Sequence, residues 1–244
     1  MSIYLRPELY EVAFSRLDVD REVEFLIDVF ELAGVRVRRV LDLGCGTCTH
    51  VHKLARCGYE VYGIDLSRDM LYYARNRGRL ALGSGICGDM RCLPFRADFF
   101  DVCTCLFDTF RHLVSRYDVV SHLREVWRVL RVGGLYIIDV ANPRGYFLDT
   151  YTIPESVCDR YDLELLDVDY VNQLEVWRLR VRYGSSWVDV GTLKLRVFFP
   201  QELLTILELL GFKVFECFGD YDTSCRLSRD CRCWRMIVVV EKVD

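Results

Sequence analysis

Apolar positions along the chain fall into short continuous runs, separated by longer stretches in which apolar residues recur every three or four positions. The continuous runs cover residues 40–43, 60–64, 80–87, 100–107 and 135–142. Runs of this length are typical of buried strands, and the spacing between them is typical of amphipathic helices. Regular alternation of the two predicts an α/β fold with a doubly wound parallel sheet and right-handed crossovers.

The C-terminal part of the chain extends this sheet. A helix is predicted from Pro200 to Gly211, followed by a sixth strand over 213–219 and a seventh over 235–243. The connection between these two strands holds no helical pattern, so we expect the last strand to pair antiparallel. The prediction is a Rossmann-like sheet of seven strands with the last one reversed, preceded by a helical arm over 1–37.

Residues 143–199 do not fit the strand–helix alternation. Apolar side chains alternate with arginines over 177–183, and a second alternating run covers 193–199. Alternation with period two around a glycine-containing turn predicts antiparallel strands with one buried and one wetted face. We therefore expect a main domain of residues 1–142 and 200–244, with a small β-rich insertion over 143–199.

Charge and composition limit the classes of molecule that this protein is expected to bind. The 244 residues are 52% hydrophobic and 28% charged, as in a globular protein, and the net charge of −4 argues against a surface built mainly for phosphate backbones. The arginines of the insertion are interrupted by Asp169, Glu175 and Asp189, so we interpret that face as solvated. No long apolar run suggests a membrane span or a signal peptide, and we expect a cytoplasmic protein without a membrane partner.

Twelve cysteines leave four alternatives: inert core residues, disulfides, metal ligands or reactive thiols. Cys45 and Cys48 have the spacing of a zinc pair but lie inside a glycine turn. Cys225, Cys231 and Cys233 cluster near the C-terminus and suit a disulfide, a habit of intracellular proteins from hyperthermophiles that this composition fits. We favour inert or disulfide-bonded cysteines and expect no metal.

The stretch with the most chemical information is the glycine turn after the first strand. Asp42, Gly44 and Gly46 lie between a strand and a helix, a geometry that brings backbone amides and a helix N-terminus close to a small polar ligand. The turn lacks the third glycine of a dinucleotide site and the lysine of a phosphate loop. Asp65 ends the second strand about 20 residues later, where an acid suits two ribose hydroxyls. A nucleotide-like cofactor is predicted here.

These residues resemble the first motif of class I S-adenosylmethionine (SAM) dependent methyltransferases, acid-x-G-x-G-x-G, with Cys48 in place of the third glycine. The resemblance continues at Gly-Asp-Met over 88–90 and in the segment 100–113, which is similar to the family's F-D-x-v-x-x…h-l. The turn over 130–134 is similar to L-x-P-G-G, with valine replacing proline. The expected reversal of the last strand also matches this family.

The resemblance implies SAM as cofactor and assigns residues to it. The residues expected to bind SAM are Asp42, Gly44, Cys45, Gly46, Asp65, Leu66, Asp89, Met90 and Phe107. Asp108 is the first candidate for a general base and His112 the second, if the nucleophile arrives protonated. For Asp108, a helix cap or a contact with the cofactor amine fits equally well, and His112 also suits a structural role. Tyr10, Tyr221 and Arg232 are candidate substrate residues.

The predicted function is methyl transfer from SAM to a small-molecule acceptor. The insertion over 143–199 follows the fifth strand, beside the expected reactive end, and is similar to the β-rich lid of some small-molecule methyltransferases. One alternative is an RNA methyltransferase, which should carry a continuous basic surface; the chain has no appended basic domain. The other is a SAM-binding protein without catalysis. A homo-oligomer is left open.

Overall fold

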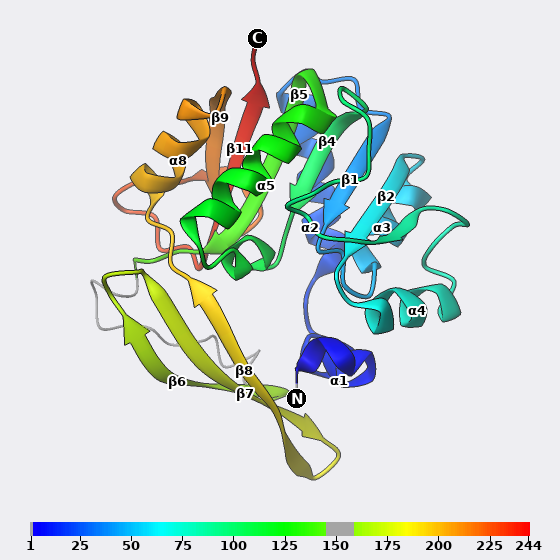
Figure 1. The fold of residues 1–244 in the computed structure, drawn as a ribbon, viewed down its shortest axis with the longest axis vertical. Helices are drawn as coiled ribbons and strands as arrows, with labels where there is room; N and C mark the ends of the chain where they lie inside the picture. The colour runs from blue at the N-terminus through cyan, green and yellow to red at the C-terminus, as the bar shows by residue number, and fades with distance from the viewer. Residues whose placement is uncertain (1, 145–158) are drawn as a thin grey trace.

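The computed structural model describes residues 2–144 and 159–244 (Figure 1). A central eight-stranded sheet has the order β10-β9-β11-β5-β4-β1-β2-β3. Its strands are β1 (Arg39–Leu43), β2 (Glu60–Asp65), β3 (Gly85–Cys87), β4 (Phe100–Cys105), β5 (Leu130–Ala141), β9 (Phe212–Gly219), β10 (Asp222–Arg226) and β11 (Arg235–Lys242). Strands β1 to β5 pair parallel, whereas β11 runs antiparallel to both β5 and β9.

This arrangement confirms the doubly wound α/β sheet and the reversed last strand. The predicted number of seven strands is wrong, because β10 adds an eighth at the sheet edge, antiparallel to β9. Its sequence, Asp-Thr-Ser-Cys-Arg, has neither an apolar run nor an apolar alternation. Such a short polar strand gives no periodic signal, so its position depends on the neighbouring strand and not on its own residues.

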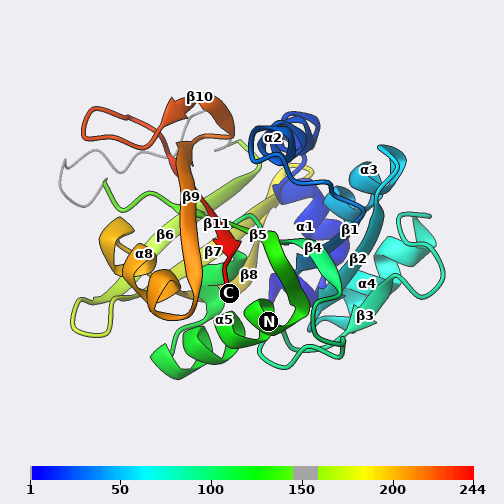
Figure 2. The same cartoon turned by 90° about the horizontal axis from the view of Figure 1, so that it is seen from above.

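Helices cover both faces of the central sheet (Figure 2). The helices on these faces are α2 (Val19–Leu32), α3 (Thr49–Arg56), α4 (Arg68–Asn76), α5 (Arg116–Val129) and α8 (Pro200–Leu209). Helix α1 (Pro7–Ala13) and the single turns η1 (Ile3–Leu5) and η2 (Thr109–His112) lie at the carboxyl end of the sheet. Helices α5 and α8 bury Leu123 and Leu203 on one face, and α2 and α3 bury Leu26 and Leu54 on the other. Ser115 caps α5 by accepting a hydrogen bond from the backbone of Tyr117.

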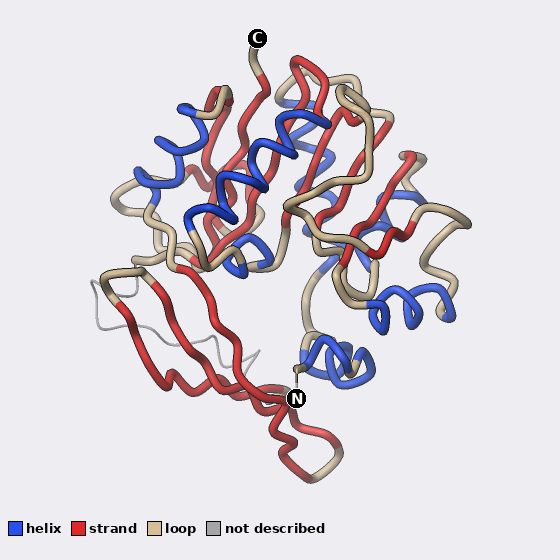
Figure 3. The backbone as a smooth tube through the Cα atoms, viewed as in Figure 1, coloured by secondary structure: helices blue, strands red, loops and turns tan. Residues whose placement is uncertain are grey.

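A second sheet of three antiparallel strands lies beyond the carboxyl ends of the parallel strands, beside α1 (Figure 3). Its strands are β6 (Tyr161–Asp169), β7 (Leu174–Tyr183) and β8 (Ser186–Arg196). Leu179, Val181 and Val190 of this sheet form one buried cluster with Ile3 and Ala13 of the N-terminal arm. Two segments distant in sequence therefore share one small core.

The antiparallel nature of the insertion is confirmed, and residues 145–158 at its predicted start lie outside the described residues. One detail of its alternation is wrong: Glu175, expected on the solvated face, is fully buried. Its partner, Arg111, comes from a distant segment, which the local pattern cannot reveal. No helix in the described ranges is both long and apolar enough to cross a bilayer.

The C-terminal cysteines give a testable prediction. The Sγ atoms of Cys225 and Cys231 lie 3.4 Å apart, close enough for a disulfide to form with little movement. In protein purified without reductant, we expect two fewer thiols by titration under denaturing conditions than the twelve found after reduction. Cys225→Ser should abolish this difference. Twelve thiols in both samples would contradict the prediction.

Candidate active site

The glycine turn after β1 forms a cradle at the carboxyl edge of the sheet. Gly44 and Gly46 have positive φ angles of 69° and 52°, which glycine adopts without strain. A Cβ atom on Gly44 would lie 2.3 Å from Cγ2 of Thr109, and one on Gly46 would lie 3.7 Å from the hydroxyl oxygen of Tyr10. The close approach of Thr109 therefore requires glycine at position 44.

Asp65, at the end of β2, is held by two backbone amides of this cradle. Its Oδ2 accepts a hydrogen bond from the Gly46 amide at 2.8 Å, and its Oδ1 accepts one from the Ser67 amide at 2.7 Å. Burial raises the pKa of this carboxyl group, and the two amides partly offset that effect. Each carboxylate oxygen keeps a lone pair. The residues thus fit a ligand that offers two hydroxyl groups, as the ribose of SAM does.

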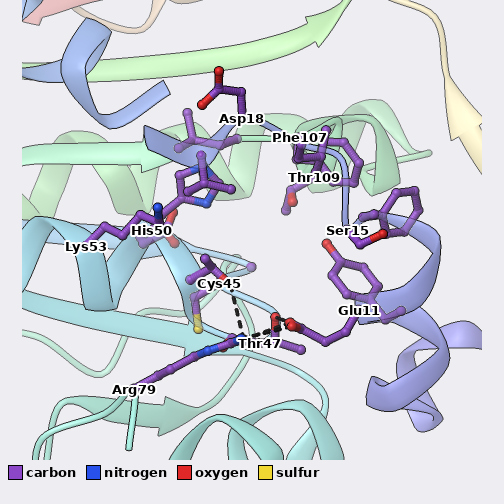
Figure 4. A pocket seen from close by; sticks show the side chains of 18 of the residues that line it. Glu11, Ser15, Asp18, Cys45, Thr47, His50, Lys53, Arg79, Phe107 and Thr109 are labelled. Atoms are coloured by element: carbon purple, nitrogen blue, oxygen red, sulfur yellow. Dashed lines mark hydrogen bonds and ion pairs between the residues drawn. The ribbon is translucent and has the colours of Figure 1, made fainter. Parts of the chain in front are cut away.

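A polar cavity of about 250 Å³ lies beside the cradle (Figure 4). Among its lining residues, Glu11 of α1 accepts hydrogen bonds from Thr47 Oγ1 at 2.5 Å and from Arg79 Nη1 at 2.7 Å. These bonds fasten the N-terminal arm to the glycine turn. Asp42 also lines the cavity, and burial raises its pKa to about 6. The cavity therefore has acidic and basic groups suited to a zwitterionic ligand end.

A second cavity, of about 340 Å³, is mainly apolar and is enclosed by three parts of the chain. Its walls come from the N-terminal arm, the carboxyl edge of the large sheet and the inner face of the small sheet. The apolar lining residues include Ile3, Tyr4, Phe14, Leu17, Tyr161, Leu163, Trp177, Leu179, Leu193, Leu195 and Trp234. Tyr10, Phe14, Gly44, Phe107 and Thr109 line both cavities, so the two adjoin at the cradle.

The chain turns sharply at the end of β4, where the two cavities meet. Phe107 and Asp108 have positive φ angles of 54° and 61°, a conformation that costs on the order of 1–3 kcal/mol for a non-glycine residue. Asp139 of β5 holds this turn, since its Oδ2 accepts hydrogen bonds from the Phe107 amide at 2.7 Å and from the Tyr221 hydroxyl at 2.6 Å. The strained turn directs both side chains toward the cavities.

Asp108 is held as a carboxylate by its surroundings. Its Oδ2 lies 2.9 Å from Arg235 Nη1 and 3.5 Å from Arg111 Nη1, and its Oδ1 accepts a hydrogen bond from the Ala141 amide at 2.7 Å. Burial by itself would raise the pKa of Asp108, but the two guanidinium groups outweigh it and hold the pKa far below its usual range. A carboxylate stabilised this strongly is a weak base.

His112, unlike Asp108, can act as a base. Its Nε2 lies 2.8 Å from the hydroxyl oxygen of Tyr4, and its ring borders the apolar cavity. Burial, with a smaller contribution from Arg111, lowers the pKa of His112, although Asp108 opposes the change. The imidazole is therefore neutral at pH 7 and able to accept a proton.

A buried ion pair joins this turn to the small sheet. The guanidinium of Arg111 forms an ion pair with Glu175 of β7, and its Nε donates to the Arg196 carbonyl oxygen of β8 at 2.8 Å. Arg111 is 4% exposed and Glu175 is 0% exposed. Trp177 Nε1 donates a further hydrogen bond to Glu175 at 2.9 Å. The small sheet is thus fixed to η2, directly beside the base candidates.

Most of the residues expected at the site converge there. The cavity walls include Tyr10, Asp42, Gly44, Cys45, Gly46, Asp65, Phe107, Asp108 and His112. Three residues expected to bind the cofactor line neither cavity: Leu66 is 69% exposed, Asp89 is bound by Arg91, and Met90 packs against the core. Their role at the cofactor remains a prediction.

Two expected substrate residues, Tyr221 and Arg232, line neither cavity. Tyr221 is buried behind Asp139, to which it donates its hydroxyl hydrogen, and Arg232 is exposed on the loop before β11. Arg235, three residues later, takes the place expected for Arg232, because the first residue of β11 points toward Asp108. Sequence reasoning also missed Arg111 and Glu175. Within residues 2–144 and 159–244, no cluster of three or more ligand-type side chains is placed to hold a metal ion.

Part of this chain is similar to a known protein family. Residues 40–134 match a protein family described as a methyltransferase domain, which covers the glycine turn, Asp65 and the end of β4. Residues 40–134 of this chain are thus similar to a methyltransferase domain. This similarity agrees with the resemblance predicted from the motifs, whose family uses SAM as its cofactor.

Individual relatives agree with the assignment. The fatty-acid O-methyltransferase of Mycolicibacterium smegmatis is 37% identical over 50% of this chain and 42% of its own length. A dTDP-3-amino-3,6-dideoxy-alpha-D-glucopyranose N,N-dimethyltransferase of Streptomyces fradiae is 29% identical over 54% of this chain and 51% of its own. The matches thus span about half the length of these curated relatives.

The fold extends further than the sequence similarity. The crystal structure of a SAM-dependent methyltransferase from Clostridium acetobutylicum superimposes with a TM-score of 0.77, covering 96% of each chain at 20% identity. The small sheet is therefore included in the shared architecture, since a superposition confined to the central sheet would cover less of the chain.

The ion pair between Arg111 and Glu175 predicts a large effect on stability. Glu175→Gln removes the nearest carboxylate from the buried guanidinium and leaves it only the contact with Asp108 at 3.5 Å, which Asp108 shares with Arg235. This loss should lower the free energy of unfolding by about 3 kcal/mol in urea titrations. Asp162→Asn, in the half-exposed pair with Arg180 on the same small sheet, is the matched control and should change it by less than about 1 kcal/mol. Equal effects of the two substitutions would contradict the role assigned to the pair.

Proposed function

We propose that this protein transfers a methyl group from SAM to a small-molecule acceptor held in the apolar cavity. One observation supports the proposal most directly: the apolar cavity adjoins the glycine cradle. The two share a wall formed by Tyr10, Phe14, Gly44, Phe107 and Thr109. A donor in the cradle would present its reactive end to an acceptor in the apolar cavity. Such a wall suits transfer between two bound molecules, for which alignment supplies much of the rate.

The cradle residues have distinct roles in this proposal. Asp65 would bind the ribose hydroxyls, and the polar cavity containing Asp42 would hold the amino-acid end of SAM. Cys45 and Gly46 would line the passage, while Leu66, Asp89 and Met90 would border the adenine. Phe107 would form the wall nearest the reactive centre. SAM, when bound, supplies a methyl group on a positively charged sulfur that a nucleophile displaces in line.

His112 is the base that the geometry favours, ahead of Asp108. Its neutral imidazole borders the acceptor cavity, and Tyr4 orients the ring through the bond to Nε2. Asp108 instead holds Arg235 and Arg111 in place, which keeps its charge from acting on a substrate proton. Proton transfer to His112 is needed only for a nucleophile that arrives protonated.

The small sheet acts as the acceptor lid. Its inner face supplies Leu163, Trp177, Leu179, Leu193 and Leu195 to the cavity wall, which excludes water from the reaction. An apolar cavity of about 340 Å³ with walls from three segments suits a compact acceptor and not a folded RNA, whose binding would require a continuous basic surface.

The proposed function predicts selective stabilisation by the cofactor. SAM and its demethylated product should each raise the melting temperature, because they bind only the folded state, and NAD should not. Asp65→Ala should weaken SAM binding by about 1–3 kcal/mol in calorimetry, whereas Asp69→Asn, on the exposed side of α4, should leave it unchanged. Mass spectrometry of a metabolite extract incubated with labelled SAM should then reveal a methylated product. SAM binding without any methylated product would favour a non-catalytic protein.

The proposed base predicts a specific pH profile. His112 faces Tyr4, Asp108 and Arg111, and its lowered pKa places the acidic fall in kcat below pH 6.5, since only the neutral imidazole accepts a proton. His112→Gln should reduce kcat by about 10²–10⁴-fold and remove that fall. His52→Gln, on α3 outside both cavities, is the control. An unchanged acidic fall in His112→Gln would show that another group titrates.

A further inference from the structure

The acceptor cavity combines apolar walls with a charged floor whose charges are already balanced. Resting on the proposed function, we propose that the acceptor is a predominantly apolar molecule without any anionic group, carrying its amine or hydroxyl nucleophile toward His112. This assignment excludes nucleotide-linked sugars and free fatty acids, both of which are anionic at neutral pH. It follows from the charges on the cavity floor and the composition of the walls.

The walls offer little to a polar acceptor. Aromatic and aliphatic side chains from all three enclosing segments dominate the lining, including Phe14, Tyr161, Trp177, Leu193 and Trp234. Apolar acceptor surface buried against these walls contributes roughly 25 cal/mol per Å² of favourable binding free energy. Burying the hydroxyl groups of a sugar there without hydrogen-bond partners would be unfavourable. Most of the acceptor's surface must therefore be apolar.

The cations of the floor are already neutralised. Arg235 lies 2.9 Å from Asp108 and 2.7 Å from Asp139, and Arg111 is paired with Glu175. Two guanidinium groups thus face three carboxylates, which gives the cluster a net charge of −1. Burial raises the pKa of Asp139, and if that carboxyl group keeps a proton the net charge becomes zero. In neither state does the cluster have an excess positive charge.

The other cations of the neighbouring cavity are also engaged. Lys53 forms an ion pair with Asp20, and Arg79 forms one with Glu11. Asp65 adds a further carboxylate to the acceptor cavity. A carboxylate or phosphate on the acceptor would therefore have to displace an internal acid from its arginine, leaving a buried charge without a partner.

Two polar groups remain for an uncharged acceptor. Nη2 of Arg235 forms an ion pair with Asp139 Oδ1 at 2.7 Å and makes no hydrogen bond to any residue in the part of the chain that the structure describes. Because this nitrogen carries two N–H groups, one of them can donate to a hydroxyl oxygen while the ion pair is kept. His112 can accept the hydrogen of an amine or hydroxyl. One donor and one acceptor beside an apolar chamber match a molecule with a single polar end.

Matched ligands test the charge preference directly. Octylamine, octanol and octanoate share one chain length, and the same comparison is made with phenethylamine, 2-phenylethanol and phenylacetate. Binding is measured by calorimetry at pH 7.5, on protein saturated with the demethylated product of SAM. We expect the amine and the alcohol to bind at least tenfold more tightly than the carboxylate in each series. A carboxylate that binds as tightly as the alcohol would overturn the proposal.

A charge added to the wall should reverse the preference. Leu193 lines the cavity on β8 and pairs with Trp177 of β7, whereas Glu175 pairs with Leu195 two residues further along β8. Leu193→Arg introduces an unbalanced guanidinium and should increase octanoate binding about tenfold while weakening octylamine. Leu193→Gln, polar but uncharged, is the control and should not increase octanoate binding. Equal gains in the two variants would mean that polarity, and not charge, sets the preference.

The experiment separates this inference from the proposed function. If the protein fails to bind SAM or its demethylated product, the proposed function fails before any acceptor is tested. If it binds them and also binds carboxylates preferentially, the methyltransferase assignment stands and the acceptor class is wrong. Folding of the Leu193 variants is verified independently by their retained affinity for the demethylated product.

Discussion

Buried charge balance at the end of β4 is the constraint on which the rest of the site depends. Asp108 and Asp139 hold Arg235, and Glu175 holds Arg111; Arg111, Asp139 and Glu175 are buried, and the side chains of Arg235 and Asp108 are 22% and 27% exposed. An unpaired charge in such a place would cost several kcal/mol. The last strand of the large sheet, the strained turn and the small sheet must therefore meet in one arrangement for each of the five charged groups to have an oppositely charged partner.

The paired charges position the side chains around the cavity but take no part in the proposed reaction. Because the arginines and acids satisfy one another, they position the walls of the acceptor cavity and leave the neutral imidazole of His112 as the group able to accept a proton. The strain at Phe107 and Asp108 is maintained by hydrogen bonds to Asp139 and Ala141. Stability and positioning thus depend on the same contacts, and the cavity they enclose remains apolar.

The N-terminal arm shows how two remote segments complete a site that the central sheet leaves open. Glu11 fastens the arm to the glycine turn through Thr47 and Arg79, and Ile3 and Ala13 pack against the small sheet. The arm therefore contacts the glycine turn on one side and the small sheet on the other. The arm and the small sheet share one buried cluster, so each helps to hold the other in position.

The sequence by itself determined the sheet, its reversed last strand and the glycine turn after β1, because apolar periodicity and the φ requirements of Gly44 and Gly46 are local properties of adjacent residues. It also predicted that Asp65 ends the second strand, since the end of a parallel strand has a fixed position at the sheet edge. Only the tertiary structure decided the rest. Arg111 and Glu175 are 64 positions apart, and their pairing leaves no local pattern. Whether Arg232 or Arg235 reaches the site depended on where β11 begins, and whether Asp108 or His112 is the better base depended on neighbours brought together by folding.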